Sequence, residues 1–320
     1  MEKRIIEILQ KLVEIDSRNP GLSRGPGEKE IAEFIGQHLQ KLRIDTELQP
    51  IESNRTNTVA IITGSNRRQS LLLNGHLDTV GAEGMPSPFS LIRDGDRLYG
   101  RGCYDMKGSL AVMLLLAEYF MQHQPPHDIL LTFVADEENK SIGMEHIVQR
   151  WLPGVTPRPF GAIFLEPTEE DIGVCHKGFT WYEVEVTGKA AHGSFPAEGI
   201  DAILPLRAAL DELDHIQSQL SVREADPLLG HATLHSSIIE GGTELSVIPA
   251  RSRLQWERRT LPHETRRELN LELNRVIQAV KSHPGNHAVK GRQIFVRRPY
   301  RVSDDALVLR RLQKYSPESK

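Results

Sequence analysis

The sequence predicts an α/β fold in which a mixed, mainly parallel sheet is flanked by helices and a separate α+β domain is inserted. Three apolar runs, at residues 71–73, 128–135 and 161–165, have the composition of strands buried on both faces, which is typical of a parallel sheet. After about residue 177 apolar and polar residues alternate instead, as in antiparallel strands with one exposed face. At 320 residues the chain exceeds what one hydrophobic core usually organises, so two domains are expected.

The first domain is expected to begin with two amphipathic helices that cover the sheet. Apolar residues recur near helical spacing over residues 2–15 and again over residues 28–42, with an Asn-Pro-Gly stop at Asn19 between them. Short strands are expected at residues 45–51 and 58–63, before the buried strand that ends at His76.

The predicted domain boundaries follow the change in pattern. The inserted domain should contain two strands, a helix, two strands and a helix, and the chain should then return to the first domain through a strand near residues 293–298 and a helix near residues 304–315. The predicted parts are the first domain at residues 1–177, the inserted domain at 178–286 and the returning part at 287–320.

Composition excludes several classes of protein. The formal net charge is −4 with both signs scattered, which gives no reason to expect a nucleic acid or an anionic membrane as a partner. The longest apolar stretch, near residues 110–116, is too short to span a bilayer. Two cysteines, Cys103 and Cys175, cannot make a disulfide framework, and the charged N-terminus does not resemble a signal peptide. We therefore expect a cytoplasmic protein.

Polar side chains that carry chemistry follow the first buried run. His76 and Asp78 lie two residues apart, so an extended chain points both side chains to the same side. In open α/β sheets ligands bind outside the carboxyl ends of the strands, which favours a site here. A histidine that is merely hydrogen-bonded at a strand end is the alternative interpretation.

Carboxylates follow the other buried elements as well. Asp105 lies in a glycine-rich loop before an apolar helix, where it can also serve as a helix cap. Asp136, Glu137 and Glu138 follow the second buried run, and Glu166 follows the third. A solvated loop would explain the acidic triplet alone, but like charges at several strand ends repel one another unless a cation compensates them. A dication cluster explains them together.

Five motifs in order carry a resemblance to a known family: His-x-Asp at 76–78, Gly-Arg-Gly-x-x-Asp-Met-Lys-Gly at 100–108, Asp-Glu-Glu at 136–138, Glu-Pro-Thr at 166–168 and Ala-His-Gly-Ser-x-Pro at 191–196. Their order resembles the acetylornithine deacetylase, succinyl-diaminopimelate desuccinylase and glutamate carboxypeptidase family of dinuclear zinc amidohydrolases, peptidase family M20. The resemblance covers residues 1 to about 315 and implies a zinc-exopeptidase-like fold.

The resemblance implies a centre of two zinc ions per subunit. His76 would bind one zinc with Glu166, Asp105 would bridge the two ions, and Glu138 would bind the second. Mixed histidine and carboxylate ligands suit zinc, and cobalt or manganese would also fit such a site.

The resemblance also implies the reaction. Glu137 would be the general base, and Asp78 would hydrogen-bond the ring nitrogen of His76 that faces away from the metal. The expected reaction is hydrolysis of an amide bond in an N-acyl amino acid or a small, dipeptide-like substrate.

The inserted domain would be the lid and dimerisation domain of the family, so a homodimer is expected. There His192 would donate to the oxyanion in the active site of the other subunit, and Arg259 would clamp a substrate carboxylate. Ser246 stands where the family usually has asparagine, so that contact is not predicted.

The end of the chain departs from the family. Members normally continue past the position of Tyr315 through a segment that supplies the last histidine ligand, so here the second zinc is expected to keep only Asp105 and Glu138. Two alternatives follow: a truncated, weakly active or inactive homologue that acts as a binding or oligomerising protein, and a mononuclear zinc aminopeptidase.

Overall fold

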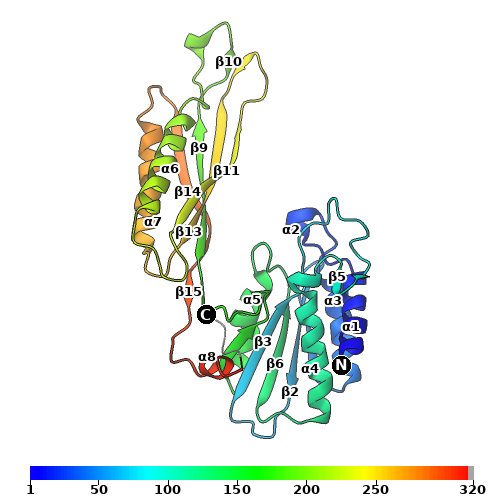
Figure 1. Ribbon diagram of the computed structural model, residues 1–320. Coiled ribbons are helices and arrows are strands. Elements are labelled where there is room, and N and C mark those ends of the chain that lie inside the picture. The colour runs from blue at the N-terminus through cyan, green and yellow to red at the C-terminus, as the bar shows by residue number, and fades with distance from the viewer. Residues whose placement is uncertain (316–320) are drawn as a thin grey trace. The chain divides into compact units, whose positions relative to one another are not determined.

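The structure is a computed structural model that describes residues 1–315. The chain forms two compact units, one made of Met1–Ile172 with the described residues from Asp304 on, the other of Gly173–Ser303. The second unit is therefore an insertion in the first. Figure 1 shows both units.

The first unit is built on a five-stranded sheet with the order β1-β2-β6-β3-β7. Strand β3 runs parallel to both β6 and β7, whereas β2 runs antiparallel to β1 and β6. The strands are β1 (Asp45–Glu52), β2 (Arg55–Ile62), β3 (Ser70–His76), β6 (Asp128–Val134) and β7 (Pro159–Phe164). Only β2 opposes the common direction, which confirms the predicted mixed, mainly parallel sheet.

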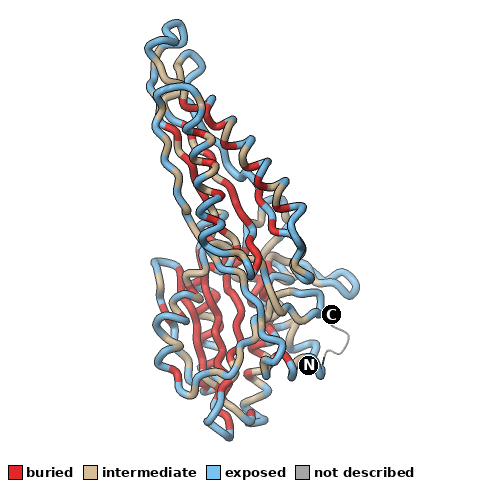
Figure 2. The backbone as a smooth tube through the Cα atoms, turned by 90° about the vertical axis from the view of Figure 1, so that its left-hand side faces the viewer, coloured by how far each residue is buried: buried red, intermediate tan, exposed pale blue. Residues whose placement is uncertain are grey.

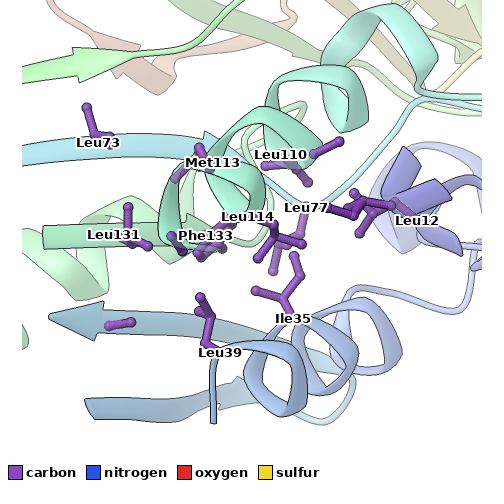
Figure 3. Close-up of a cluster of buried hydrophobic side chains, with 14 of the residues drawn as sticks. Leu12, Ile35, Leu39, Leu73, Leu77, Leu110, Met113, Leu114, Leu131 and Phe133 are labelled. Carbon is purple, nitrogen blue, oxygen red and sulfur yellow. The ribbon is translucent and has the colours of Figure 1, made fainter. Parts of the chain in front are cut away.

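Three helices cover one face of this sheet and form the main core with it. They are α1 (Glu2–Glu14), α3 (Lys29–Lys41) and α4 (Gly108–Gln122). Figure 3 shows Leu114 of α4 and Ile35 of α3 pointing toward Phe133 of β6, and all three side chains are fully buried. The helices lie on this face because their apolar residues recur at helical spacing, as the sequence predicts.

The other face carries shorter elements. Ile147 and the partly buried Trp151 pack against the sheet there, contributed by α5 (Ile142–His146) and the turns η2 (Ile147–Trp151) and η3 (Leu152–Gly154). The C-terminal helix α8 (Leu307–Leu312) packs on β7. Elements that the sequence did not predict are a single turn α2 (Pro20–Ser23), a hairpin of β4 (Ile92–Asp94) and β5 (Arg97–Tyr99), and the wide turn η1 (Cys103–Lys107).

Helix α4 approaches β3 very closely at Gly75. A Cβ atom there would lie 2.7 Å from Cδ2 of Leu110 and 3.0 Å from Cε of Met106. Any larger residue would push the helix away, so the glycine in Asn-Gly-His allows the start of α4 to sit against the end of β3. This contact places the loop before α4 beside His76.

The second unit is a four-stranded antiparallel sheet with the order β11-β13-β9-β14, packed on two helices (Figure 1). Its strands are β9 (Gly178–Thr187), β11 (Thr233–Gly241), β13 (Arg251–Thr260) and β14 (Ala288–Arg297), and its helices are α6 (Leu206–Ser221) and α7 (Arg266–Lys281). Smaller pieces are η4 (Pro196–Glu198) and two pairs of short strands, β10 (Ala191–His192) with β12 (Val247–Ile248) and β8 (Cys175–His176) with β15 (Tyr300–Arg301). Figure 2 shows that buried stretches follow the strands of each sheet.

The prediction for the returning strand was wrong. Strand β14 does not rejoin the first domain but pairs with β9 as an edge strand of the second unit, so the second crossing lies at residues 303–304 instead of near residue 286. Its register places Val289 beside Val186 on the helix-covered face and Lys290 beside Glu185 on the other. The alternation of apolar and polar residues predicts a half-exposed strand, but it does not show which sheet the strand joins.

No helix in the described part of the chain is long and apolar enough to cross a membrane. The last five residues of the predicted returning part, 316–320, lie outside the described residues.

Candidate metal centre

The candidate site lies where three neighbouring parallel strands end. His76 is the last residue of β3, Glu137 and Glu138 follow β6, and Glu166 follows β7. Because β6, β3 and β7 are adjacent and parallel, their carboxyl ends meet at one edge of the sheet. The fold itself therefore brings together side chains that are up to 90 positions apart in sequence.

The carboxylates converge on Nε2 of His76. That nitrogen lies 2.9 Å from Oδ1 of Asp105, 3.7 Å from Oε2 of Glu166 and 4.0 Å from Oε2 of Glu137. Two sets of three potential ligand atoms, each within 4.8 Å of one another, share the histidine: His76 with Glu137 and Glu166, and His76 with Asp105 and Glu138. The described residues thus offer two adjacent half-sites around one imidazole.

Asp105 reaches this point from the turn η1 at the start of α4. Gly102 has φ of 83°, a conformation that glycine adopts without strain. Lys107, which is 1% exposed, donates from Nζ to the carbonyl oxygen of Ile15 at 2.7 Å, and the His76 backbone N–H lies 3.0 Å from Sδ of Met106. The turn is fixed on both sides of Asp105, while the carboxylate itself is 49% exposed.

The expected contact between Asp78 and His76 takes a different form. The hydrogen-bond partner of His76 Nδ1 is the backbone oxygen of Asp78 at 2.9 Å, and Oδ1 of the carboxylate lies farther away, at 3.5 Å. The carboxylate instead accepts the backbone N–H groups of Glu137 at 3.0 Å and of Glu138 at 3.1 Å. Asp78 therefore holds the loop that carries two of the acidic side chains, a role that the His-x-Asp spacing does not reveal.

The negative charges of the four carboxylates in this cluster outnumber the one positive charge that His76 can carry. Partial burial raises the pKa of Glu137 to about 7, and repulsion from Glu166 and Asp78 adds to the effect. Burial raises the pKa of Glu138 to about 7 as well, with repulsion from Asp105. Burial lowers the pKa of His76, but the hydrogen bond to Asp105 and the nearby negative charge of Asp78 outweigh it and raise that pKa to about 11. The raised pKa values show that the negative charges of these carboxylates are poorly compensated by the protein, and a bound cation would compensate them.

The donor set fits a divalent metal ion. One imidazole nitrogen and four carboxylates are the ligand types that zinc, cobalt and manganese accept. His76 is 1% exposed, whereas Asp105, Glu137 and Glu166 are 37–49% exposed, so the metal-facing side also admits water and substrate. A rigid histidine with exposed carboxylates is the pattern of a catalytic site rather than of a closed structural one.

Two predicted site residues belong to the second unit and are not in this cluster. His192 lies in β10, where its Nδ1 accepts the backbone N–H of Ser194 at 3.2 Å. Arg259 lies in β13, bonded from Nε to Oε1 of Glu257 at 2.6 Å and placed over the ring of Phe179. The backbone oxygen of Ser246 accepts the N–H of Gly193 at 2.8 Å, which joins the segment that contains His192 to the segment that contains Ser246.

Sequence reasoning missed three residues that support the cluster from behind. Asn19, Arg55 and Asp136 are all at most 7% exposed and are joined by hydrogen bonds. In the sequence Asn19 indicates only a helix stop, and Asp136 is one of three consecutive acidic residues. The one signal for Arg55 is that it is the single charged residue of its strand.

Known proteins match the chain in sequence and in fold. The model of "Peptidase family M20/M25/M40" matches residues 72–314. A probable carboxypeptidase from Aspergillus terreus is 33% identical over 70% of this chain and 54% of its own length, so the chain spans just over half of that relative. The acetylornithine deacetylase of Proteus mirabilis is 29% identical over 80% of this chain and 67% of its own length.

A solved structure has the same fold. The M20 family metallo-carboxypeptidase of Sulfolobus solfataricus superposes with a TM-score of 0.75 at 17% identity, over 98% of this chain and 83% of that one. The family match covers well over half of the chain and includes all four predicted metal ligands. The chain belongs to peptidase family M20/M25/M40.

Proposed function

We propose that the protein is a metal-dependent hydrolase that cleaves the amide bond of an N-acyl amino acid or of a small, dipeptide-like substrate. The observation that carries this proposal is the convergence of four carboxylates on the Nε2 edge of His76 at a partly exposed strand end. The family match and the names of the relatives, a deacetylase and probable carboxypeptidases, support the same reaction class.

The metal ligands in this proposal are His76 and Glu166 for one ion, Asp105 as the bridge, and Glu138 for the second. Zinc is the proposed metal, two ions per chain, with cobalt and manganese as substitutes of similar ligand preference. When bound, the metal would polarise the scissile carbonyl and lower the pKa of an attacking water.

Glu137 is the proposed general base. Its Oε2 lies 4.0 Å from Nε2 of His76, and its carboxylate is 47% exposed, so it reaches the space where water and substrate enter. It would accept the proton of the attacking water and pass it to the leaving amine. Asp78 fixes the backbone N–H of Glu137, which keeps this side chain from drifting away from the reacting atoms.

Two residues of the second unit are proposed to act on the substrate. Since Nδ1 of His192 accepts a backbone N–H, a neutral ring carries its hydrogen on Nε2, which can donate to the oxyanion of the tetrahedral intermediate. Arg259 is 45% exposed and would bind a substrate carboxylate through its guanidinium group.

Metal-dependent turnover tests the proposal. We expect the protein to hydrolyse N-acetylated amino acids or dipeptides after zinc or cobalt is added, and to lose that activity when a chelator removes the metal. Release of the free amino acid is measured against a reaction with metal and without protein. Absence of metal-dependent release across a panel of acyl groups and side chains would contradict the proposed function.

We also propose that the protein is a cytoplasmic homodimer that associates through the second unit. Strand β11 ends the four-stranded sheet and is exposed along nearly its whole length, with Ile238 at 47% and Ile239 at 55% exposure. An exposed edge with apolar side chains favours pairing with another strand, and a second copy supplies one by two-fold symmetry. Both cysteines are free thiols, which fits a reducing compartment.

Replacing Ile238 and Ile239 by lysine should convert the dimer to a monomer, because lysine on an edge strand opposes strand pairing. The measurement is light scattering after size exclusion at micromolar concentration. The matched control is Ile294→Lys, which is 43% exposed on the opposite edge strand β14 and should leave the dimer intact. A monomeric wild type, or dissociation only in the control, would contradict this interface.

A further inference from the structure

Arg55 is a buried cation directly behind the candidate metal centre. Its side chain is 8% exposed and donates from Nη1 to Oδ1 of Asp136 at 2.5 Å and to Oε1 of Glu28 at 3.2 Å. Its Nη2 donates to Oδ1 of Asn19 at 2.8 Å. The planar guanidinium thus joins the start of β2 to three segments that are separate in the sequence.

Asn19 connects Arg55 to the two loops that carry Asp78 and Asp136. Its Nδ2 donates to Oδ2 of Asp78 at 2.7 Å and to Oδ1 of Asp136 at 3.0 Å. Its Oδ1 accepts from Gly21 N as well as from Arg55. Both amide hydrogens and two acceptor positions are therefore used, which fixes the orientation of the amide.

The two carboxylates that Asn19 contacts organise the loop after β6. Asp78 accepts the backbone N–H groups of Glu137 and Glu138, as described above. Asp136 has φ of 65° and accepts the backbone N–H of Lys140 at 3.2 Å, which closes the turn. The positions of both glutamates thus depend on two buried carboxylates, and each of these is bonded to Asn19.

We propose that Arg55 is a positioning residue for the metal centre, acting through Asn19 and Asp136 to hold Glu137 and Glu138 where they face the metal. The inference rests on the proposed metal site and adds a residue that lies outside it. Arg55 contacts Asn19, Asp136 and Glu28. It therefore affects the metal centre by fixing the loops that carry the ligands, and it is not itself a ligand. Removing a direct hydrogen-bond partner of a metal ligand typically changes metal affinity about 10- to 100-fold. Because Arg55 acts through Asn19 and Asp136, we expect an effect at the lower end of that range.

The substitution Arg55→Lys tests whether the shape of the arginine side chain matters in addition to its positive charge. Arg55→Lys keeps one positive charge beside Asp136 but loses the fork that bonds Asn19 and Asp136 at once. Asn19→Ser provides a second route to the same test: serine still caps the turn α2 through its oxygen, but it lacks the amide hydrogens that reach Asp78 and Asp136.

The second unit offers a matched control. Arg258 is 0% exposed and is bonded to Glu264 and Glu272, so it is also a buried arginine between two carboxylates. Arg258→Lys should disturb the stability of its own unit in the same manner as Arg55→Lys disturbs the first. It has no hydrogen-bonded connection to the metal-facing loops through the described contacts, so metal affinity should not change.

The experiment measures the zinc dissociation constant of each full-length protein by competition with a chelator, together with circular dichroism of the metal-free form. We expect Arg55→Lys and Asn19→Ser to bind zinc about 10-fold more weakly than wild type, with Arg258→Lys within about twofold of it. If Arg55→Lys does not fold, Asn19→Ser decides the question.

Three results would overturn the inference, and they differ in what else they affect. Folded Arg55→Lys or Asn19→Ser protein that binds zinc as tightly as wild type would refute the positioning role alone. A wild-type protein that binds no zinc would refute the proposed metal site and this inference with it. Equal weakening in Arg258→Lys would show a general effect of lost stability, which also contradicts a specific role.

Discussion

Glu137→Gln is expected to lower turnover by about 10²- to 10⁴-fold while the protein keeps its metal. Glutamine has nearly the same shape as glutamate but cannot accept the proton of the attacking water. The backbone N–H of Glu137 remains bonded to Asp78, so the loop should keep its position. The measurement pairs the rate of amide hydrolysis with the metal content of the same sample.

The metal content separates two roles for Glu137, since its carboxylate also falls within one of the potential ligand sets. Loss of metal together with activity would make it a ligand and would contradict the general-base assignment. Glu170→Gln, an exposed acid in the loop after β7, is the matched control and should be as active as wild type.

Asp105→Asn is expected to release metal from both half-sites. Asp105 is the carboxylate nearest to Nε2 of His76, at 2.9 Å, and the proposal makes it the bridge between the two ions. An amide oxygen carries no full charge and binds zinc poorly, so the loss of affinity should exceed the roughly 10- to 100-fold cost of removing an indirect partner. Activity should fall with the metal content.

The control for this variant is Asp96→Asn, in the exposed turn of the β4–β5 hairpin, which removes the same charge far from the strand ends. Metal content measured by mass spectrometry after dialysis should be unchanged there. An Asp105→Asn protein that keeps two ions would show that this residue does not bridge them.

The sequence shows which polar residues follow the buried strands, but it does not show how the strands are connected in the sheet. Buried parallel strands are continuous apolar runs, so each run shows where it ends and which polar residue follows it, as at His76, Glu138 and Glu166. Strand adjacency is not encoded in that pattern. The order β6-β3-β7, which brings these residues to one edge, and the pairing of β14 with β9 emerge only from the structure.

The supporting residues are hidden for a related reason. Arg55 stands at the head of a strand whose following residues are almost all buried, and its partners Asn19 and Asp136 lie 36 and 81 positions away. No periodicity links such residues, because they share neither a helix face nor a strand. The role of Asp78 was missed in part for the same reason, since its carboxylate bonds a loop some 60 residues farther along the chain.

The metal content of the wild-type protein tests whether the cluster around His76 is a metal centre. The full chain is loaded with zinc, dialysed against metal-free buffer and measured by mass spectrometry for zinc per polypeptide. We expect two zinc ions per chain, held by the cluster around His76 and lost in Asp105→Asn. A folded wild-type chain that retains no zinc, cobalt or manganese would contradict this expectation.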